Sequence, residues 1–210
     1  MSSAAPKPHS IKLFYMNQGG AGGDSGAVRY SDYEILCIAE SAEPKHQFKV
    51  VWGSKDSLPL MSVQVHEDAG RLVIGLKDTD LTAKTVRPIV TFTVKDQVFR
   101  VVFVHLKSGN ETQANAALEA SVANLKTLLI DENAPVLWIG DFNRAASLAA
   151  FAKGTESIVN GGGQSHWNLD RVYTTGTWPK GVKVSAKQVS TSGDNAHAGY
   201  AITVDSSNRA

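Results

Sequence analysis

The sequence predicts an α+β protein in which two β-sheets pack face to face and helices lie on the outside. Apolar residues occur mainly in short runs that are rich in β-branched and aromatic side chains, and several runs alternate with period two as half-buried strands do. Clear helical patterns are few. The 210 residues suit a single domain that can bury its own core, and no repeat or low-complexity linker indicates a second one.

The predicted strands follow one another along most of the chain. The first, "IKLFYMN", and a later one, "FRVVFVHL", are dominated by apolar residues and end in a polar or turn-forming segment. The full set covers residues 11–17, 34–40, 48–53, 61–67, 71–77, 87–94, 99–106, 135–142, 169–176, 182–190 and 200–205. This number of strands is enough for two packed sheets.

Two segments are predicted as helices. Residues 110–132 place Leu118, Val122, Leu125 and Leu129 at spacings of three and four, which is the apolar stripe of a helix that covers a sheet. Asn110 or a close neighbour is expected to cap the start of this helix. A shorter helix is expected at 145–154, with Gly154 at its end, and glycine-rich loops at 19–33 and 159–168.

Composition excludes several classes of protein. The net charge of +1 gives no global attraction to nucleic acid, so a phosphate-bearing partner has to be bound by a local basic patch. The lone Cys37 cannot form an intrachain disulfide, and its apolar surroundings indicate a small buried side chain. No stretch approaches the roughly 20 apolar residues of a membrane span. Residues 1–10 show no signal-peptide pattern and are expected to be a flexible tail.

Polar residues recur where apolar strands begin or end, and one edge of a two-layer sandwich can bring such ends together. Carboxylate and amide oxygens suit Mg²⁺, a histidine can deprotonate water, and amide or guanidinium groups can hold phosphate oxygens. The pattern therefore indicates metal-assisted phosphoryl transfer. The candidates are Asn17, Glu40, His105, Asp141, Asn143, Asp170, Asp194 and His197.

The same residues lie in motifs that resemble those of the DNase I-like endonuclease/exonuclease/phosphatase superfamily. "GDFNR" resembles the family's signature, and it is accompanied in the family's order by "YMNQGG", "ILCIAESA", "VVFVHLKSG", "LDRVYTTG" and "SGDNAHAGYAITVD". The resemblance covers most of the chain. It implies a four-layer α/β/β/α arrangement, with residues 11–206 as one DNase I-like domain. Within the superfamily, "NQGG", "RPIVTFTV" and "GDFNR" look most like the nuclease subunit of cytolethal distending toxins.

The resemblance also implies a role for each candidate. Glu40 would be the main ligand of Mg²⁺, or of Mn²⁺ or Ca²⁺, with help from Asn17. His197 would be the general base, oriented by Asp194, and His105 would stabilise the phosphate or protonate the leaving oxygen. Asp141 and Asn143 would position the water and the scissile phosphate, Asp170 would orient His105, and Arg87 and Arg144 would contact phosphates.

The expected function is Mg²⁺-dependent hydrolysis of DNA phosphodiester bonds with little sequence preference. A toxin or effector role and a protein partner in a toxin complex follow from the same resemblance. The location is left open: with no signal peptide visible, the expectation is the cytoplasm or delivery as an effector. Two alternatives stay open. Phosphoinositide phosphatases and sphingomyelinases share this fold and site, so the first alternative is a phosphoinositide or other phosphoesterase on the same fold. The second is a catalytically impaired binding module, because Ala196 stands where the family has the Asp directly before its His.

Overall fold

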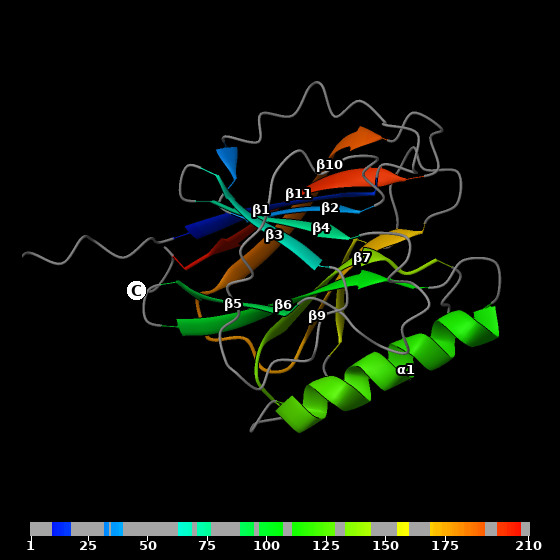
Figure 1. Ribbon diagram of the computed structural model, residues 1–210. Coiled ribbons are helices and arrows are strands. Elements are labelled where there is room, and N and C mark those ends of the chain that lie inside the picture. The colour runs from blue at the N-terminus through cyan, green and yellow to red at the C-terminus, as the bar shows by residue number, and fades with distance from the viewer. Residues whose placement is uncertain are drawn as a thin grey trace, which may run out of the picture.

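Two β-sheets and one α-helix are formed by the described residues, and the helix lies against the second sheet (Figure 1). The structure is a computed structural model. It describes residues 10–17, 32–33, 35–39, 63–68, 71–76, 89–94, 97–106, 111–128, 133–143, 155–159, 169–191 and 197–206.

The first sheet has six strands in the order β10-β11-β1-β2-β4-β3. β1 (Ser10–Asn17) runs antiparallel to β11 (Ala198–Asp205) and parallel to β2 (Ile35–Ala39). The other strands are β10 (Lys183–Thr191), β4 (Arg71–Leu76) and β3 (Val63–Asp68). The first and last strands of the described chain are thus neighbours inside one sheet.

The second sheet has five strands in the order β5-β6-β7-β9-β8. Their bounds are β5 (Ile89–Val94), β6 (Gln97–His105), β7 (Val136–Asp141), β9 (Asp170–Thr175) and β8 (Glu156–Val159). β6 and β7 are parallel, and α1 (Glu111–Leu128) lies between them in the sequence. A parallel pair requires such a crossover, and here the helix supplies it.

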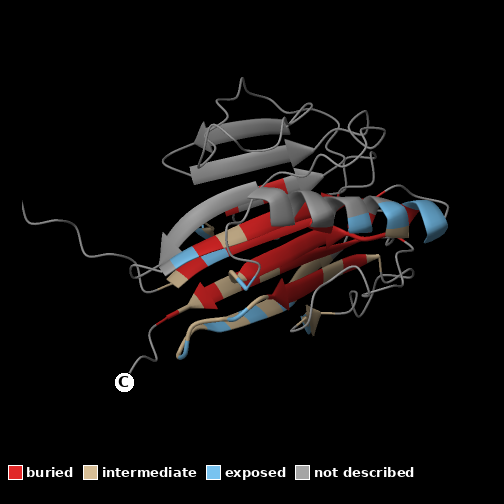
Figure 2. Cartoon of the chain, turned by 90° about the horizontal axis from the view of Figure 1, so that it is seen from below, coloured by how far each residue is buried: buried red, intermediate tan, exposed pale blue. Residues whose placement is uncertain are grey.

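The main core lies between the two sheets, and every second residue of the central strands contributes to it. Leu13 and Tyr15 of β1 face Phe103 of β6 and Ile139 of β7, and all four are fully buried. Figure 2 shows buried positions along the central strands and exposed positions on α1. Alternate residues of β6 and β7 enter this core, and the residues between them enter a second core on the other face of the sheet.

A second core lies between α1 and the outer face of the second sheet. Ala114, Leu118 and Val122 recur every four residues and form one stripe of the helix. They belong to the same buried cluster as Val104 and Trp138, whose side chains point away from the first sheet. The structure confirms the predicted helix from residue 111 to 128.

The predicted α+β sandwich is confirmed, and one strand was missed. β8 is only four residues long, lies at a sheet edge and begins with the exposed Glu156 and Ser157, so it carries little apolar signal. β1 begins at Ser10, at the end of the predicted tail. The strand predicted at 48–53, the short helix at 145–154 and most of both glycine-rich loops lie outside the described residues.

Candidate functional site

Three polar side chains stand side by side at one end of the second sheet. In the strand register His105 of β6 lies opposite Asp141 of β7, and Asp141 lies opposite Asp170 of β9. Residues that pair across strands point to the same face. Each of the three stands two positions from an apolar residue of the main core, so the polar row continues the inner face of the sheet to its end.

The first sheet contributes Asn17 and His197 to the same place. Asn17 ends β1, two positions after the inward-facing Tyr15, and its Nδ2 donates a hydrogen bond of 3.1 Å to Asp141 Oδ2. His197 directly precedes β11, and its Nδ1 lies 3.8 Å from the same Asp141 oxygen. Residues from both sheets therefore meet in one buried group, the polar cluster. Its members are Asn17, His105, Asp141, Asn143, Asp170 and His197.

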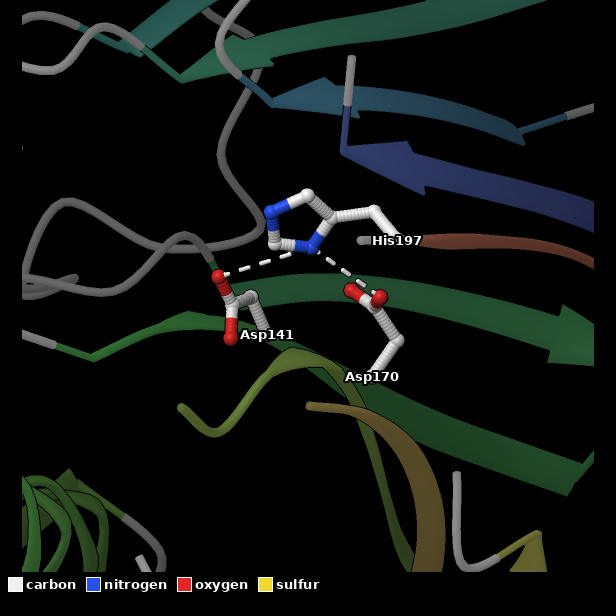
Figure 3. Close-up of side chains that lie close together, drawn as sticks. All are labelled: Asp141, Asp170 and His197. Carbon is white, nitrogen blue, oxygen red and sulfur yellow. Dashed lines mark hydrogen bonds and ion pairs between the residues drawn. The ribbon is translucent and has the colours of Figure 1, made fainter. Parts of the chain in front are cut away.

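Asp170 is fully buried and holds His197 in place. Its Oδ2 lies 3.1 Å from Nδ1 of His197 and also accepts a hydrogen bond of 2.9 Å from the main-chain N–H of Ala198. Since an ionised carboxylate only accepts hydrogen bonds, Nδ1 of His197 carries the proton. Figure 3 shows that the other ring nitrogen, Nε2, points away from Asp170. This is the tautomer of an imidazole that can accept a proton at Nε2.

Asp141 lies at the centre of the polar cluster. Its Oδ1 accepts a hydrogen bond of 2.6 Å from the main-chain N–H of Asn143, and His105 Nε2 lies 3.6 Å from its Oδ2. Burial raises the pKa of Asp141 to about 6, and the neighbouring Asp170 carboxylate adds to the rise. His105, His197 and the Asn143 N–H act in the opposite direction. Asp141 therefore changes its charge within two units of neutral pH.

The backbone around Asp141 is shaped for close contact with β6. Gly140 has a φ of +150°, and a Cβ at this position would lie 1.8 Å from the main-chain oxygen of Val104. Asn143 has a φ of 47°, in the left-handed region that asparagine tolerates, and its Nδ2 donates to the main-chain oxygen of Leu106. The "GDFN" segment thus fastens the chain that follows β7 to the end of β6.

Six of the ten predicted site residues lie together in the polar cluster, and the other four, Glu40, Arg87, Arg144 and Asp194, lie outside the described residues. One contact differs from expectation. We expected Asp170 to orient His105, whereas the carboxylate of Asp170 bonds His197. The register explains the difference, because Asp141 stands between His105 and Asp170 in the sheet. The expected contact of Asp194 with His197 lies outside the described residues.

Sequence reasoning missed two tyrosines beside Asp170. The Tyr15 hydroxyl donates a hydrogen bond of 3.1 Å to Asp170 Oδ1, and the Tyr200 hydroxyl lies 3.4 Å from its main-chain oxygen. A signal was available for Tyr15, which stands two residues before Asn17 and therefore on the same face of β1. Tyr200 stands opposite Tyr15 in the register.

The donor set bears on which residues could hold a metal ion. Asp141, Asp170 and His197 bring one ligand atom each within 4.8 Å of one another. However, the Asp170 oxygens and His197 Nδ1 are already engaged with one another and with Tyr15 and Ala198. A cation held by Asp141, Asp170 and His197 would therefore compete with the contacts of the Asp170–His197 pair. The buried Asn17 adds an amide oxygen, which is a hard ligand, to the cluster.

Comparisons with known proteins show the fold. No family model matches the chain, and no curated protein matches it in sequence. Among solved structures, the beta toxin of Staphylococcus aureus superposes with a TM-score of 0.55 at 14% identity, covering 93% of this chain and 99% of that one. A humanized TDP2 of D. rerio gives 0.52 at 12% identity, covering 94% and 99%, and TDP2 of C. elegans gives 0.52 at 12%, covering 93% and 75%.

These likenesses span nearly the whole chain, and the protein therefore has the DNase I-like fold that its motifs predicted. In the described part of the chain, no helix is both long and apolar enough to cross a membrane.

Proposed function

We propose that the protein is a Mg²⁺-dependent phosphodiesterase that cuts the DNA backbone with little sequence preference. The observation that carries this proposal is the buried Asp170–His197 pair, which lies beside Asp141 and Asn17 at the end of a DNase I-like sandwich. The resemblance of the sequence motifs to those of nucleases supports DNA as the substrate.

His197 is the general base of the proposed reaction. Asp170 keeps the proton on Nδ1, so Nε2 accepts the proton of the attacking water. The negative charge of Asp170 also stabilises the imidazolium that this transfer produces. The Ala198 N–H fixes the same carboxylate oxygen, so that the base is held by two elements.

His105, Asp141 and Asn143 act on the phosphate side of the cluster. His105 lies against Asp141 and donates a hydrogen bond or a proton to the phosphoryl group. The main-chain N–H of Asn143 and the amide of Asn17 hold the Asp141 carboxylate in one orientation, in which it positions the scissile group. Arg87 and Arg144 are proposed phosphate contacts.

Asn17 and Glu40 would hold the metal ion. When bound there, Mg²⁺ supplies Lewis-acid stabilisation of the charge that develops on the phosphate oxygens. The protein contacts the sugar-phosphate backbone of the DNA. Such contacts fix the position of the duplex and carry no information about the bases, so little sequence preference is expected.

A plasmid-nicking assay tests the proposal. Supercoiled plasmid is incubated with the protein in Mg²⁺ or in EDTA, together with His197→Ala and with His66→Ala, a control histidine on the edge strand β3. We expect nicks that require Mg²⁺, persist in His66→Ala and fall by at least a thousandfold in His197→Ala. The nicks should be sealed by DNA ligase, since the reaction leaves 5′-phosphate and 3′-hydroxyl ends.

Two other outcomes would contradict DNA cleavage. Intact plasmid together with hydrolysis of a phosphoinositide or another phosphoester by the wild-type protein would move the proposal to that substrate. Intact plasmid and intact phosphoesters, with DNA retained in a binding assay, would indicate a binding module.

A further inference from the structure

We propose that Tyr15 is a positioning residue, whose hydroxyl fixes the Asp170 carboxylate so that the second carboxylate oxygen faces His197. The inference deepens the proposed hydrolysis and rests on it, because His197 acts there as the general base. It assigns a part in the site to a residue of the main core of the sandwich.

The contact joins the two sheets across the core. Tyr15 belongs to β1 of the first sheet and Asp170 to β9 of the second, and both side chains are fully buried. The hydroxyl donates a hydrogen bond of 3.1 Å to Oδ1 of Asp170. Oδ2 accepts hydrogen bonds from His197 Nδ1 and from the Ala198 N–H. The two oxygens of one carboxylate are thus divided between a fixed donor and the catalytic imidazole.

This division matters because the carboxylate of aspartate turns easily. The last torsion of an aspartate side chain is broad and nearly two-fold, so packing alone fixes its plane poorly. A hydrogen bond to Oδ1 restricts the rotation and keeps Oδ2 directed at His197.

Tyr200 provides a natural internal control. It pairs with Tyr15 in the strand register and is also buried, but its hydroxyl lies 3.4 Å from the main-chain oxygen of Asp170 and not from the carboxylate. Burial raises the pKa of both tyrosines, so each keeps its proton and remains a donor at neutral pH. The two residues share chemistry and surroundings and differ in the oxygen that they reach.

The first experiment needs neither substrate nor activity. The low-field proton NMR signal of His197 Nδ1–H is identified by its loss in His197→Ala and is then followed in Tyr15→Phe and Tyr200→Phe. We expect Tyr15→Phe to shift the signal or broaden it through faster exchange, because Asp170 no longer holds one orientation. We expect Tyr200→Phe to leave the signal in place.

The second experiment separates positioning from packing by steady-state kinetics on plasmid DNA with Mg²⁺. Tyr15→Phe should lower kcat by about 10- to 100-fold, a loss similar to that seen when a residue that orients a metal-binding side chain is removed. We expect KM to stay within about twofold of wild type. Tyr200→Phe should stay near wild type. A raised KM with unchanged kcat, or equal losses in both variants, would overturn the proposal.

The outcomes distinguish this inference from the proposed function. If the wild-type protein cuts DNA and Tyr15→Phe leaves both the signal and kcat unchanged, the positioning role is wrong and the function stands. If no phosphoester is hydrolysed but the signal responds to Tyr15→Phe alone, the function fails and the positioning of Asp170 stands. Should Tyr15→Phe fold poorly, 3-fluorotyrosine placed at position 15 keeps the shape and makes the hydroxyl a stronger donor. An unmoved His197 signal in that protein would also overturn the proposal.

Discussion

The Asn17 side chain donates a 3.1 Å hydrogen bond to Asp141, although the two residues end strands of different sheets. Both side chains are buried, and Asp141 lies in the same cluster as a second carboxylate, that of Asp170. A buried carboxylate without donors is costly, so this bond is needed both for the stability of the sandwich end and for the shape of the site.

Asn17→Ala should therefore destabilise the fold as well as impair the site. The change removes a donor from a buried carboxylate, and we expect the free energy of unfolding to fall by about 1–3 kcal/mol. Urea denaturation at pH 7 in EDTA measures the loss without any contribution from a bound metal. Val98→Ala, at a position that is 46% exposed, is the control and should change stability far less. Equal stability of Asn17→Ala and wild type would show that the bond contributes nothing.

The raised pKa of Asp141 predicts how stability depends on pH. Because its pKa is about 6 in the folded protein and near 3.8 in the unfolded chain, the folded state binds this proton more tightly. The contribution of Asp141 to stability is therefore fully present below pH 3.8 and is lost as the pH rises through 6. When the pH is lowered from 7 to 4.5, the contribution of Asp141 to the free energy of unfolding should rise by about 2 kcal/mol.

The Asp141→Asn variant isolates this effect. Unfolding free energies of wild type and variant are measured at pH 7 and pH 4.5 in EDTA, and the gain on acidification is compared between them. Other titrating groups contribute to both proteins, so the difference reports Asp141. A gain that is as large in Asp141→Asn as in wild type would contradict the pKa assignment.

Gly140→Ala should be among the most damaging single changes in the second sheet. The added Cβ would collide with the main-chain oxygen of Val104 in the neighbouring strand, at a φ that alanine rarely adopts. We expect a loss of roughly 3 kcal/mol or more, seen as a lower melting temperature or as insoluble protein. Gly181→Ala, in the turn before β10 with a φ of 83°, serves as the control and should cost about 1 kcal/mol. Similar melting temperatures for the two variants would argue against the close approach of β6 and β7.

Asp170→Asn tests the tautomer assigned to His197. An asparagine amide can present its NH₂ to Nδ1, which moves the ring proton to Nε2 and removes the base. We expect plasmid nicking to fall by about three to four orders of magnitude, with the fold retained. Asp32→Asn, at an exposed aspartate, should nick as wild type does. A loss of only a few-fold in Asp170→Asn would mean that His197 does not depend on this carboxylate.

Much of this arrangement could be predicted because the inward-facing periodicity of a strand extends to its last residue. Phe103 and His105, or Ile139 and Asp141, are two positions apart, so the residue that continues the core is also the residue that enters the site. The motif order then placed these ends in one cluster. Local sequence therefore determined which residues gather.

The partners within the cluster could not be predicted in the same way. Which imidazole meets Asp170 depends on the register of β6, β7 and β9 and on the approach of β11 from the other sheet, and these are long-range features. Tyr15 was overlooked because an aromatic residue on a core face predicts packing first. Its hydroxyl bonds Asp170 of the other sheet, and no local pattern in β1 predicts that contact.

The pairing of β1 with β11 also has a consequence for how the protein is made. Tyr15 of β1 stands opposite Tyr200 of β11, so the antiparallel ladder between these two strands can close only after β11 has been synthesised. A nascent chain that still lacks His197 has no imidazole beside Asp170. Folding is then dominated by distant contacts and is expected to be slow. The Asp170–His197 pair can therefore form only after the segment that leads into β11 has been synthesised.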